Sequence, residues 1–318
     1  MISARPERLA LALLLASPAL AARPRPPALP PLLLDAAAPL IEVEVAGQRL
    51  RLTVDIGGDD IVQLNPDSPA RAVLAAASRP DGKPVDRGLY RVAVGQTALA
   101  IPFSRETLII AGQPVRARVL QPAATPVGQG AGSDGVIGLP LLPHPGLEWH
   151  WRPATPADRA ISVPARIGRS DAWGLDWAVK HGGRLDVELH PLRTSSVVSA
   201  AAASSLAAAG GGQLIGPVRR VPISFGAVRP VRQLALARPV VIAGLRLDQA
   251  QVRLFDWAGR TSLPPDADPA AELTVTGTRG RQDQWANAKL GRDVLAACAS
   301  LRWSREPAQF TLVCPATD

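Results

Sequence analysis

The residue with the clearest chemical potential is a carboxylate placed on a glycine turn. Residues 50–54, Leu-Arg-Leu-Thr-Val, form an apolar stretch typical of a strand, and Asp55 ends it. Ile56, Gly57 and Gly58 follow, and a second apolar run begins soon after. Burying a charged group between strands costs free energy unless the group is paired or used. We therefore interpret Asp55 as a candidate catalytic acid and the three residues after it as its loop.

Strands are expected to position this loop. Residues 41–45 alternate apolar and polar side chains, which predicts a half-buried strand. Ala46-Gly47-Gln48 is a turn signal, so residues 49–55 are expected to return as the second strand of a hairpin. Similar patterns predict two further hairpins, at residues 89–101 and 108–120. A short helix is expected at residues 70–77.

The second half of the chain repeats the order of the first. Residues 47–55 align without a gap with residues 182–190, so His190 stands at the position of Asp55. An insertion at about 260–282 accounts for the change in offset along the repeat. Four further matches follow in the same order: 60–62 with 196–198, 109–112 with 241–244, 136–142 with 289–295, and 147–149 with 301–303. Two such lobes would face each other across a pseudo-twofold axis, so we expect Asp55 to face His190.

The paired motifs resemble the aspartic proteases, in particular the retropepsin-like secreted bacterial group. In that family each lobe carries a strand, then Asp-Thr/Ser-Gly-Ala, and later an apolar pair followed by Gly. Residues 54–58 and 134–138 match these motifs in the first half, and residues 290–295 match in the second. The resemblance, which covers residues 39–313, implies an all-β, bilobal acid-protease fold of the pepsin/retropepsin-like type. It implies two tandem β-barrel-like lobes with short helices, and aspartic-type endopeptidase activity in the family.

The chemistry of that family needs two carboxylates that share a proton, one ionised and one protonated. The sequence departs from this pattern in both halves. Ile56 replaces the Thr whose hydroxyl links the lobes, and His190-Pro191-Leu192-Arg193 stands where Asp-Thr-Gly-Ala is expected. Leu192 therefore occupies the position of a glycine, and the nearest acids, Asp186 and Glu188, are out of register. A two-carboxylate mechanism is not supported.

Three hypotheses remain for the site. In the first, the chain keeps the protease fold but has lost hydrolysis. In the second, Asp55 and His190 form an asymmetric acid/base pair, because imidazole exchanges protons near neutral pH. In the third, the halves are misaligned and the second acid lies elsewhere. We favour the first, and expect the Arg193 guanidinium to pair with Asp55 and keep it ionised.

The ends of the chain predict export. Residues 1–22 hold two arginines, a short apolar run and small residues near Ala21 and Ala22, which is typical of a cleaved signal peptide; an uncleaved anchor is the alternative. Residues 23–38 are Pro-rich and predict an extended leader. We divide the remainder into an N-terminal lobe at 39–152, a linker at 153–180 and a C-terminal lobe at 181–318.

Two cysteines, Cys298 and Cys314, lie near the C-terminal end of the 318-residue chain. An exported protein meets an oxidising compartment, so we expect a disulfide, with two buried thiols as the alternative. No metal-ligand spacing occurs, and we expect neither metal nor cofactor. The net charge of +8 comes from scattered arginines, without the clustering that nucleic-acid binding requires.

These features predict a periplasmic or secreted protein that is monomeric and has no stable membrane insertion after signal cleavage. The partner that the resemblance implies is a peptide or an unfolded protein segment in the cleft between the lobes. The competing class is a non-catalytic binding module of the cell envelope that holds an extended peptide by strand addition.

Overall fold

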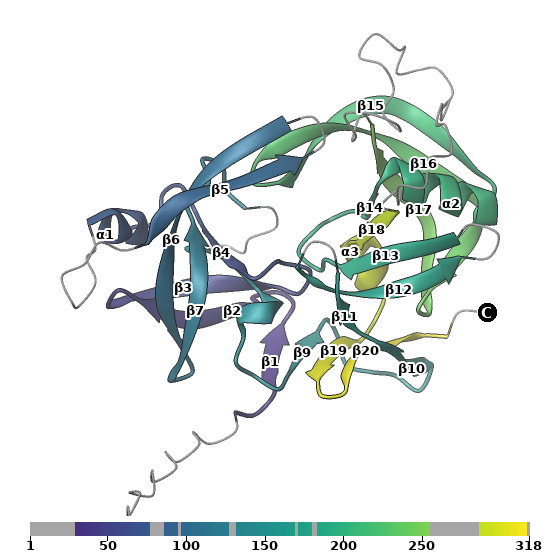
Figure 1. The fold of residues 1–318 in the computed structure, drawn as a ribbon. Coiled ribbons are helices and arrows are strands. Elements are labelled where there is room, and N and C mark those ends of the chain that lie inside the picture. The colour runs from purple at the N-terminus through teal and green to yellow at the C-terminus, as the bar shows by residue number, and fades with distance from the viewer. Residues whose placement is uncertain are drawn as a thin grey trace, which may run out of the picture.

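The computed structural model describes residues 29–76, 86–94, 97–126, 132–168, 171–179, 183–254 and 286–316. The predicted signal peptide, the Gly-rich residues 127–131 and the insertion at about 260–282 lie outside these ranges. The described chain consists mainly of strands arranged in three sheets, with a few short helices, which confirms the all-β prediction (Figure 1). No helix within the described ranges is long and apolar enough to cross a membrane.

The first half folds into a seven-stranded sheet. The chain enters through an antiparallel hairpin whose tip, Ala46-Gly47, has positive φ at both residues (48° and 74°). Such a two-residue turn matches the twist of the strands that it joins. The sheet order is β2 (Leu40–Val45), β3 (Gln48–Asp55), β8 (Gly135–Gly138), β4 (Ile61–Leu64), β7 (Gln113–Leu120), β6 (Thr97–Ile110) and β5 (Arg87–Val94). Helix α1 (Ala70–Ala76) follows β4, where the sequence predicts a helix.

The second half folds into an eight-stranded sheet. Its order is β11 (Arg166–Ile167), β12 (Trp173–Val179), β13 (Gly183–Leu189), β18 (Asn287–Leu290), β14 (Val197–Val198), β17 (Leu245–Arg253), β16 (Ala227–Ile242) and β15 (Gly212–Ser224). Helix α2 (Ala200–Gly210) follows β14, as α1 follows β4. Ser199 caps the start of α2 by accepting a hydrogen bond from the Ala202 amide, and Gly211 ends the helix in the left-handed conformation.

The two sheets share one pattern of strand pairing. In the first, β3 runs parallel to β8, β8 antiparallel to β4, and β4 parallel to β7. In the second, β13, β18, β14 and β17 pair in the same senses. The register also agrees, because Thr53 lies opposite Val136 and Glu188 lies opposite Lys289. The strand pairing therefore agrees with the gapless alignment of residues 47–55 with 182–190. Asp55 and His190 lie at equivalent strand ends.

A third sheet joins segments from both halves. Its order is β1 (Leu32–Asp35), β9 (Gly146–His150), β19 (Ser300–Arg305), β20 (Ala308–Pro315) and β10 (Asp158–Pro164). Trp149 and Trp303 are both buried in the core that it covers. The short helices η1 (Leu139–Leu141) and α3 (Arg292–Leu295) lead from each half toward this sheet.

Two segments carry more regular structure than their composition predicts. β1 lies within the predicted leader, and residues 153–180, which we expected to be a linker, contain β10, β11 and β12. β12 is an integral strand of the second sheet, because it pairs with β13 from Gly174 to Val179. The Pro and Arg residues of these segments hide the alternation on which a strand prediction depends. β1 and β10 gain their stability instead from partners far along the chain.

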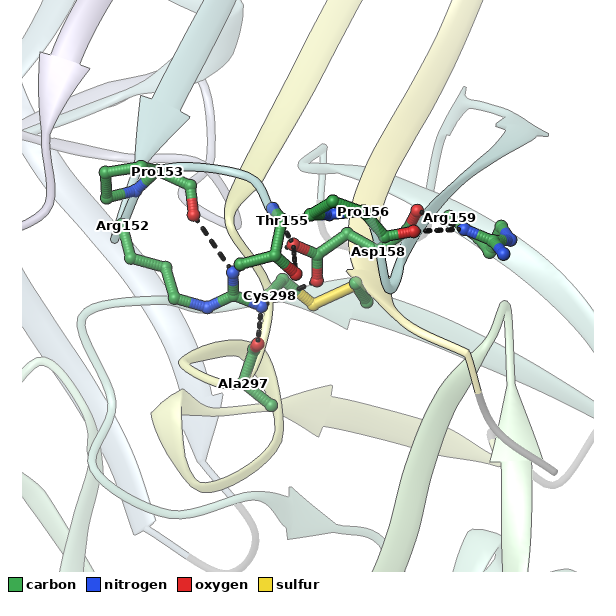
Figure 2. A network of polar contacts seen from close by, with 9 residues as sticks. Arg152, Pro153, Thr155, Pro156, Asp158, Arg159, Ala297 and Cys298 are labelled. Atoms are coloured by element: carbon green, nitrogen blue, oxygen red, sulfur yellow. Dashed lines mark hydrogen bonds and ion pairs between the residues drawn. A yellow bond between two sulfur atoms is a disulfide. The ribbon is translucent and has the colours of Figure 1, made fainter.

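A polar network holds the start of this connection in place (Figure 2). The Arg152 guanidinium donates to both carboxylate oxygens of Asp158, at 2.9 and 2.7 Å, and to the Ala297 carbonyl at 2.9 Å. Thr155 adds its amide and hydroxyl to the same carboxylate. These bonds, above all the one from Arg152, hold the pKa of Asp158 well below its usual range. The turn after β9 is thereby fixed to the turn after α3.

The disulfide predicted from the sequence is present in the same region. Cys298 lies in the turn after α3, Cys314 lies on β20, and their sulfur atoms are bonded. Both side chains are buried in the core. The bond therefore joins the turn after the last helix to the last strand.

Two long hairpins extend from the halves and meet (Figure 1). The β5–β6 hairpin contributes Val94 to a buried cluster that also contains Ile223 and Ala227 of the β15–β16 hairpin. The Tyr90 and Phe225 rings pack at a centroid distance of 5.7 Å across the same contact. β5 and β15 are the last strands of their sheets, so the two sheet edges approach each other through their side chains.

Candidate functional site

Asp55 is the last residue of β3, and its loop closes at once. The Gly58 amide donates to the Asp55 carbonyl at 3.1 Å, and the Gly57 amide donates to its carboxylate at 3.2 Å. Gly138, opposite Asp55 in the ladder, lets the loop pack down, because a Cβ there would lie 1.7 Å from the Asp59 carbonyl oxygen. Ile56 points into the core and is fully buried. The loop is therefore held by both its backbone and its apolar side chain.

His190 occupies the equivalent position after β13. Its amide donates to the Leu290 carbonyl at 2.8 Å, and the Arg193 amide donates back to the His190 carbonyl at 2.9 Å. The turn thus closes as the Asp55 turn does, without a glycine. Neither Leu192 nor Gly57 adopts positive φ. Leu192 therefore stands at the position of a glycine without needing a backbone conformation that only glycine adopts easily.

Gly57 is required for space rather than for backbone freedom. A Cβ at this position would lie 2.5 Å from Cε1 of His190 and within 2.7 Å of both ring nitrogens. The His190 ring therefore packs flat against the backbone of the opposite loop, and no other residue leaves room for it. Gly58 is also confined, since a Cβ there would lie 3.0 Å from the Cα of Gly138.

The structure brings Asp55 and His190 together, as the alignment of the halves predicts. Nδ1 of His190 lies 3.5 Å from Oδ1 of Asp55, and their side chains are only 6% and 18% exposed. Burial opposes ionisation of Asp55. The adjacent His190 and, more weakly, the charges of Arg193 and Lys289 nevertheless hold the pKa of Asp55 below its ordinary value. The first half therefore supplies an ionised acid and the second half supplies an imidazole.

Glu188, which sequence reasoning set aside as out of register, is part of the same group of side chains. It is fully buried, and its Oε2 lies 2.9 Å from Nε2 of His190. Lys289 donates to the same oxygen at 2.7 Å, and Asn287 donates to Oε1 at 2.9 Å. Burial opposes ionisation here too, but Lys289 and His190 keep the pKa of Glu188 far below its usual range.

A signal for Glu188 was available in the sequence. The gapless alignment pairs Glu188 with Thr53 and Lys289 with Val136, so two opposite charges fall on adjacent strands where the first half has none. In the first half the corresponding hydroxyl of Thr53 donates to the Ser133 hydroxyl at 2.9 Å. Opposite charges at paired positions of two predicted buried strands indicate an ion pair.

Arg193 does not make the ion pair that we expected with Asp55. Its buried guanidinium donates to the carbonyl of Ile223 and, at 3.5 Å, to that of Pro222, at the end of β15. Burial lowers the pKa of Arg193, while the negative charges of Asp55 and Glu188 raise it. Arg193 thus acts on Asp55 through its charge at longer range and links the His190 turn to the β15–β16 hairpin.

Asp59, four residues after Asp55, is a second carboxyl group in this region. Burial raises the pKa of Asp59 to about 7; the charges of Glu188 and Asp55 act in the same direction, and Lys289 and His190 oppose it. Asp55 and Asp59 are thus pushed apart in acidity, with Asp55 ionised and Asp59 half-protonated near neutral pH. The sequence indicates only that Asp59 solvates a turn or lines the cleft.

The raised pKa of Asp59 predicts a specific pH dependence of stability. Folded Asp59 keeps a proton that the unfolded chain, with its ordinary pKa of 3.8, has released. Its contribution to stability therefore falls as the pH rises from about 4 to about 7. In Asp59→Asn that loss is absent, so above pH 7 we expect the variant to exceed the native protein in free energy of unfolding by at least about 1 kcal/mol.

Urea unfolding across this pH range measures the difference between the two proteins. Asp60→Asn, one residue along the loop, controls for the removal of a negative charge from the same turn. A difference between Asp59→Asn and the native protein that does not change with pH would refute the assignment.

Within the described ranges, no group of three or more His, Cys, Asp or Glu side chains is arranged to hold a metal ion. The polar side chains of the site instead satisfy one another in a row from Asp55 through His190 and Glu188 to Lys289. No protein-family model matches the sequence, and no curated protein matches it. The function is therefore argued from this row of side chains and the strands that carry it.

Proposed function

We propose that the chain is a bilobal protein of the pepsin/retropepsin-like type that holds an extended peptide segment between its halves without two-carboxylate hydrolysis. The repeated pairing of strands in the two sheets supports the bilobal fold. The disulfide supports an exported protein in an oxidising compartment. We place the site where the loops of the two halves meet, at Asp55 and His190.

The observation that carries the proposal is which groups surround the ring of His190. Both of its ring nitrogens face carboxylates, Nδ1 toward Asp55 at 3.5 Å and Nε2 toward Glu188 at 2.9 Å. Two-carboxylate hydrolysis requires two like acids that compete for one proton, so that one stays protonated as the donor. Here the group facing Asp55 is a base that favours its ionised form. Asp55 is therefore kept ionised, and this pair of residues lacks the protonated carboxyl group that the two-carboxylate mechanism needs as its donor.

Peptide binding is supported by the sheet edges near the site. β5 and β15 are both terminal strands, and their hairpins touch through a small apolar cluster that includes Val94 and Ile223. A terminal strand has unpaired backbone groups on one side and can bind an extended segment as a further strand. Tyr90 and Phe225 would contact alternate side chains of such a segment.

A second candidate function is hydrolysis by Asp55 and His190 as an asymmetric acid/base pair. The 3.5 Å contact and the fixed ring favour it, because a base held in place by a third group is a recurring catalytic arrangement. This function can be distinguished from peptide binding by measurement, because hydrolysis releases cleaved peptide products.

The test incubates the purified mature protein with a mixed peptide library from acid to neutral pH and measures both retention and cleavage. We expect retention without cleavage, reduced in Asp55→Asn and unchanged in Asp248→Asn, an exposed acid paired with Arg246. Cleavage abolished by both Asp55→Asn and His190→Ala would favour the asymmetric pair. Absence of both retention and cleavage would contradict peptide recognition.

A further inference from the structure

The second half contains a buried ion pair at positions where the first half carries uncharged residues. Glu188 on β13 and Lys289 on β18 are paired in the parallel ladder, and their charged ends meet at 2.7 Å. Thr53 and Val136 hold the equivalent positions in the first half. Burying two charges is costly even when they attract each other, so the pair needs a reason beyond packing. His190, two residues after Glu188 on the same strand end, supplies one.

The contacts of Glu188 determine which ring nitrogen of His190 carries a proton. Both oxygens of Glu188 already accept hydrogen bonds from Asn287 and Lys289, which favour the ionised carboxylate. An ionised oxygen 2.9 Å from Nε2 is stabilised by an N–H at that position and destabilised by a lone pair. Lys289 also approaches Nε2, but at 3.4 Å, which is a longer contact than that of the carboxylate.

We infer that Glu188 is a positioning residue, which keeps a proton on Nε2 of His190 and leaves Nδ1 as the ring nitrogen that faces Asp55 and any bound segment. The ring is fixed from two sides, by Glu188 within its own half and by the Gly57 backbone of the other half. Lys289 and Asn287 keep Glu188 ionised and oriented. Nδ1 remains the ring nitrogen that faces the ionised Asp55 carboxylate, 3.5 Å away, and that can bind a polar group of the ligand.

This inference deepens the proposed function, since the relevance of Nδ1 to a ligand rests on peptide binding at this site. The opposite arrangement is chemically distinct. If Lys289 governed the ring, Nε2 would be unprotonated and would accept a hydrogen bond from Nζ. The other charged groups around the ring, Asp59 and Arg193, make no direct hydrogen bond to it.

The test is NMR of the imidazole nitrogens in histidine-labelled protein near neutral pH, with the His190 signals assigned by His190→Gln. We expect a protonated Nε2 in the native protein and loss of this preference in Glu188→Gln, whose amide can donate or accept. Because Glu188→Gln leaves Lys289 buried without its partner, the double variant Glu188→Gln/Lys289→Met provides a folded comparison. Glu148→Gln removes the acid beside His150, at 3.4 Å, and is the matched control for a Glu–His contact.

An unprotonated Nε2 in the native protein, or an unchanged His190 spectrum in the double variant, would overturn the inference. Peptide affinity measured on the same proteins gives the functional readout. We expect the double variant to bind the retained peptides at least about tenfold more weakly, and Glu148→Gln to bind as the native protein does. If the native protein retains no peptide, the proposed function fails, while the ring spectrum still decides the role of Glu188.

Discussion

Glu188→Ala is expected to lower the free energy of unfolding by about 3–5 kcal/mol, the range measured when one partner of a buried ion pair is removed. The side chain is fully buried and accepts from Lys289 and Asn287 while facing His190. Its loss leaves the Lys289 ammonium without its carboxylate in a site where that group is only 11% exposed. Chemical denaturation at neutral pH measures the change.

The matched control is Glu148→Ala on β9. Glu148 also pairs with a cation, Arg302 at 3.0 Å, but that guanidinium is 59% exposed and remains hydrated when its partner is removed. We expect a loss of less than about 1 kcal/mol for this variant. The double variant Glu188→Ala/Lys289→Met should regain part of the stability that Glu188→Ala loses, because it no longer buries an unpaired charge. Equal losses for Glu188→Ala and Glu148→Ala would show that the buried pair is not coupled to the fold.

The sequence predicts the parts of this fold that depend on local pattern and on repetition. The hairpin tips at Ala46-Gly47, Ala111-Gly112 and Ala243-Gly244 all take positive φ, and the last two were matched by alignment alone. The same alignment pairs Thr53 with Glu188 and Val136 with Lys289. The ladder registers agree with it, since Thr53 lies opposite Val136 and Glu188 lies opposite Lys289. A repeat constrains two halves at once, so weak matches in a fixed order carry information about long-range pairing.

The remaining features depend on partners that are distant in sequence. β10 is stabilised by pairing with β20, and β1 by pairing with β9, and neither pairing leaves a periodic signal in Pro- and Arg-containing segments. The position of Arg193 could not be predicted either, since the carbonyls of Pro222 and Ile223 that it binds lie 29 and 30 residues later in the chain. Side-chain direction at such a site is decided by tertiary packing.

The pKa of Asp59 is a further property that could not be predicted from the sequence. Its acidity depends on burial and on four charged groups, three of them from the other half of the molecule. A sequence motif identifies which residue ends a strand, but it does not report the burial that determines whether a carboxyl group is ionised. The sequence therefore predicts the positions of Asp55 and His190 well, because they follow from the repeat. It predicts poorly the residues whose role depends on contacts between the two halves.

Removal of the disulfide is the second large effect that we expect. Cys298 and Cys314 are separated by 16 residues, and closing a loop of this length in the unfolded chain is worth about 3 kcal/mol in the chain-entropy description. The loop contains β19 and most of β20, which pair with each other and connect to β9 and β10 of the third sheet. Cys298→Ala/Cys314→Ala should therefore unfold at lower denaturant, by about 3 kcal/mol in free energy.

The native protein in excess reductant separates the bond from the side chains. If the cross-link is the source of stability, reduced native protein should approach the double variant, and oxidised native protein should stand apart from both. The cavity left by the buried sulfur atoms affects only the variant, so any difference between the variant and the reduced protein measures packing alone. Coincident unfolding curves for oxidised protein and double variant would instead place the stability of the third sheet in its strand pairing and in the Arg152–Asp158 network beside the bond (Figure 2).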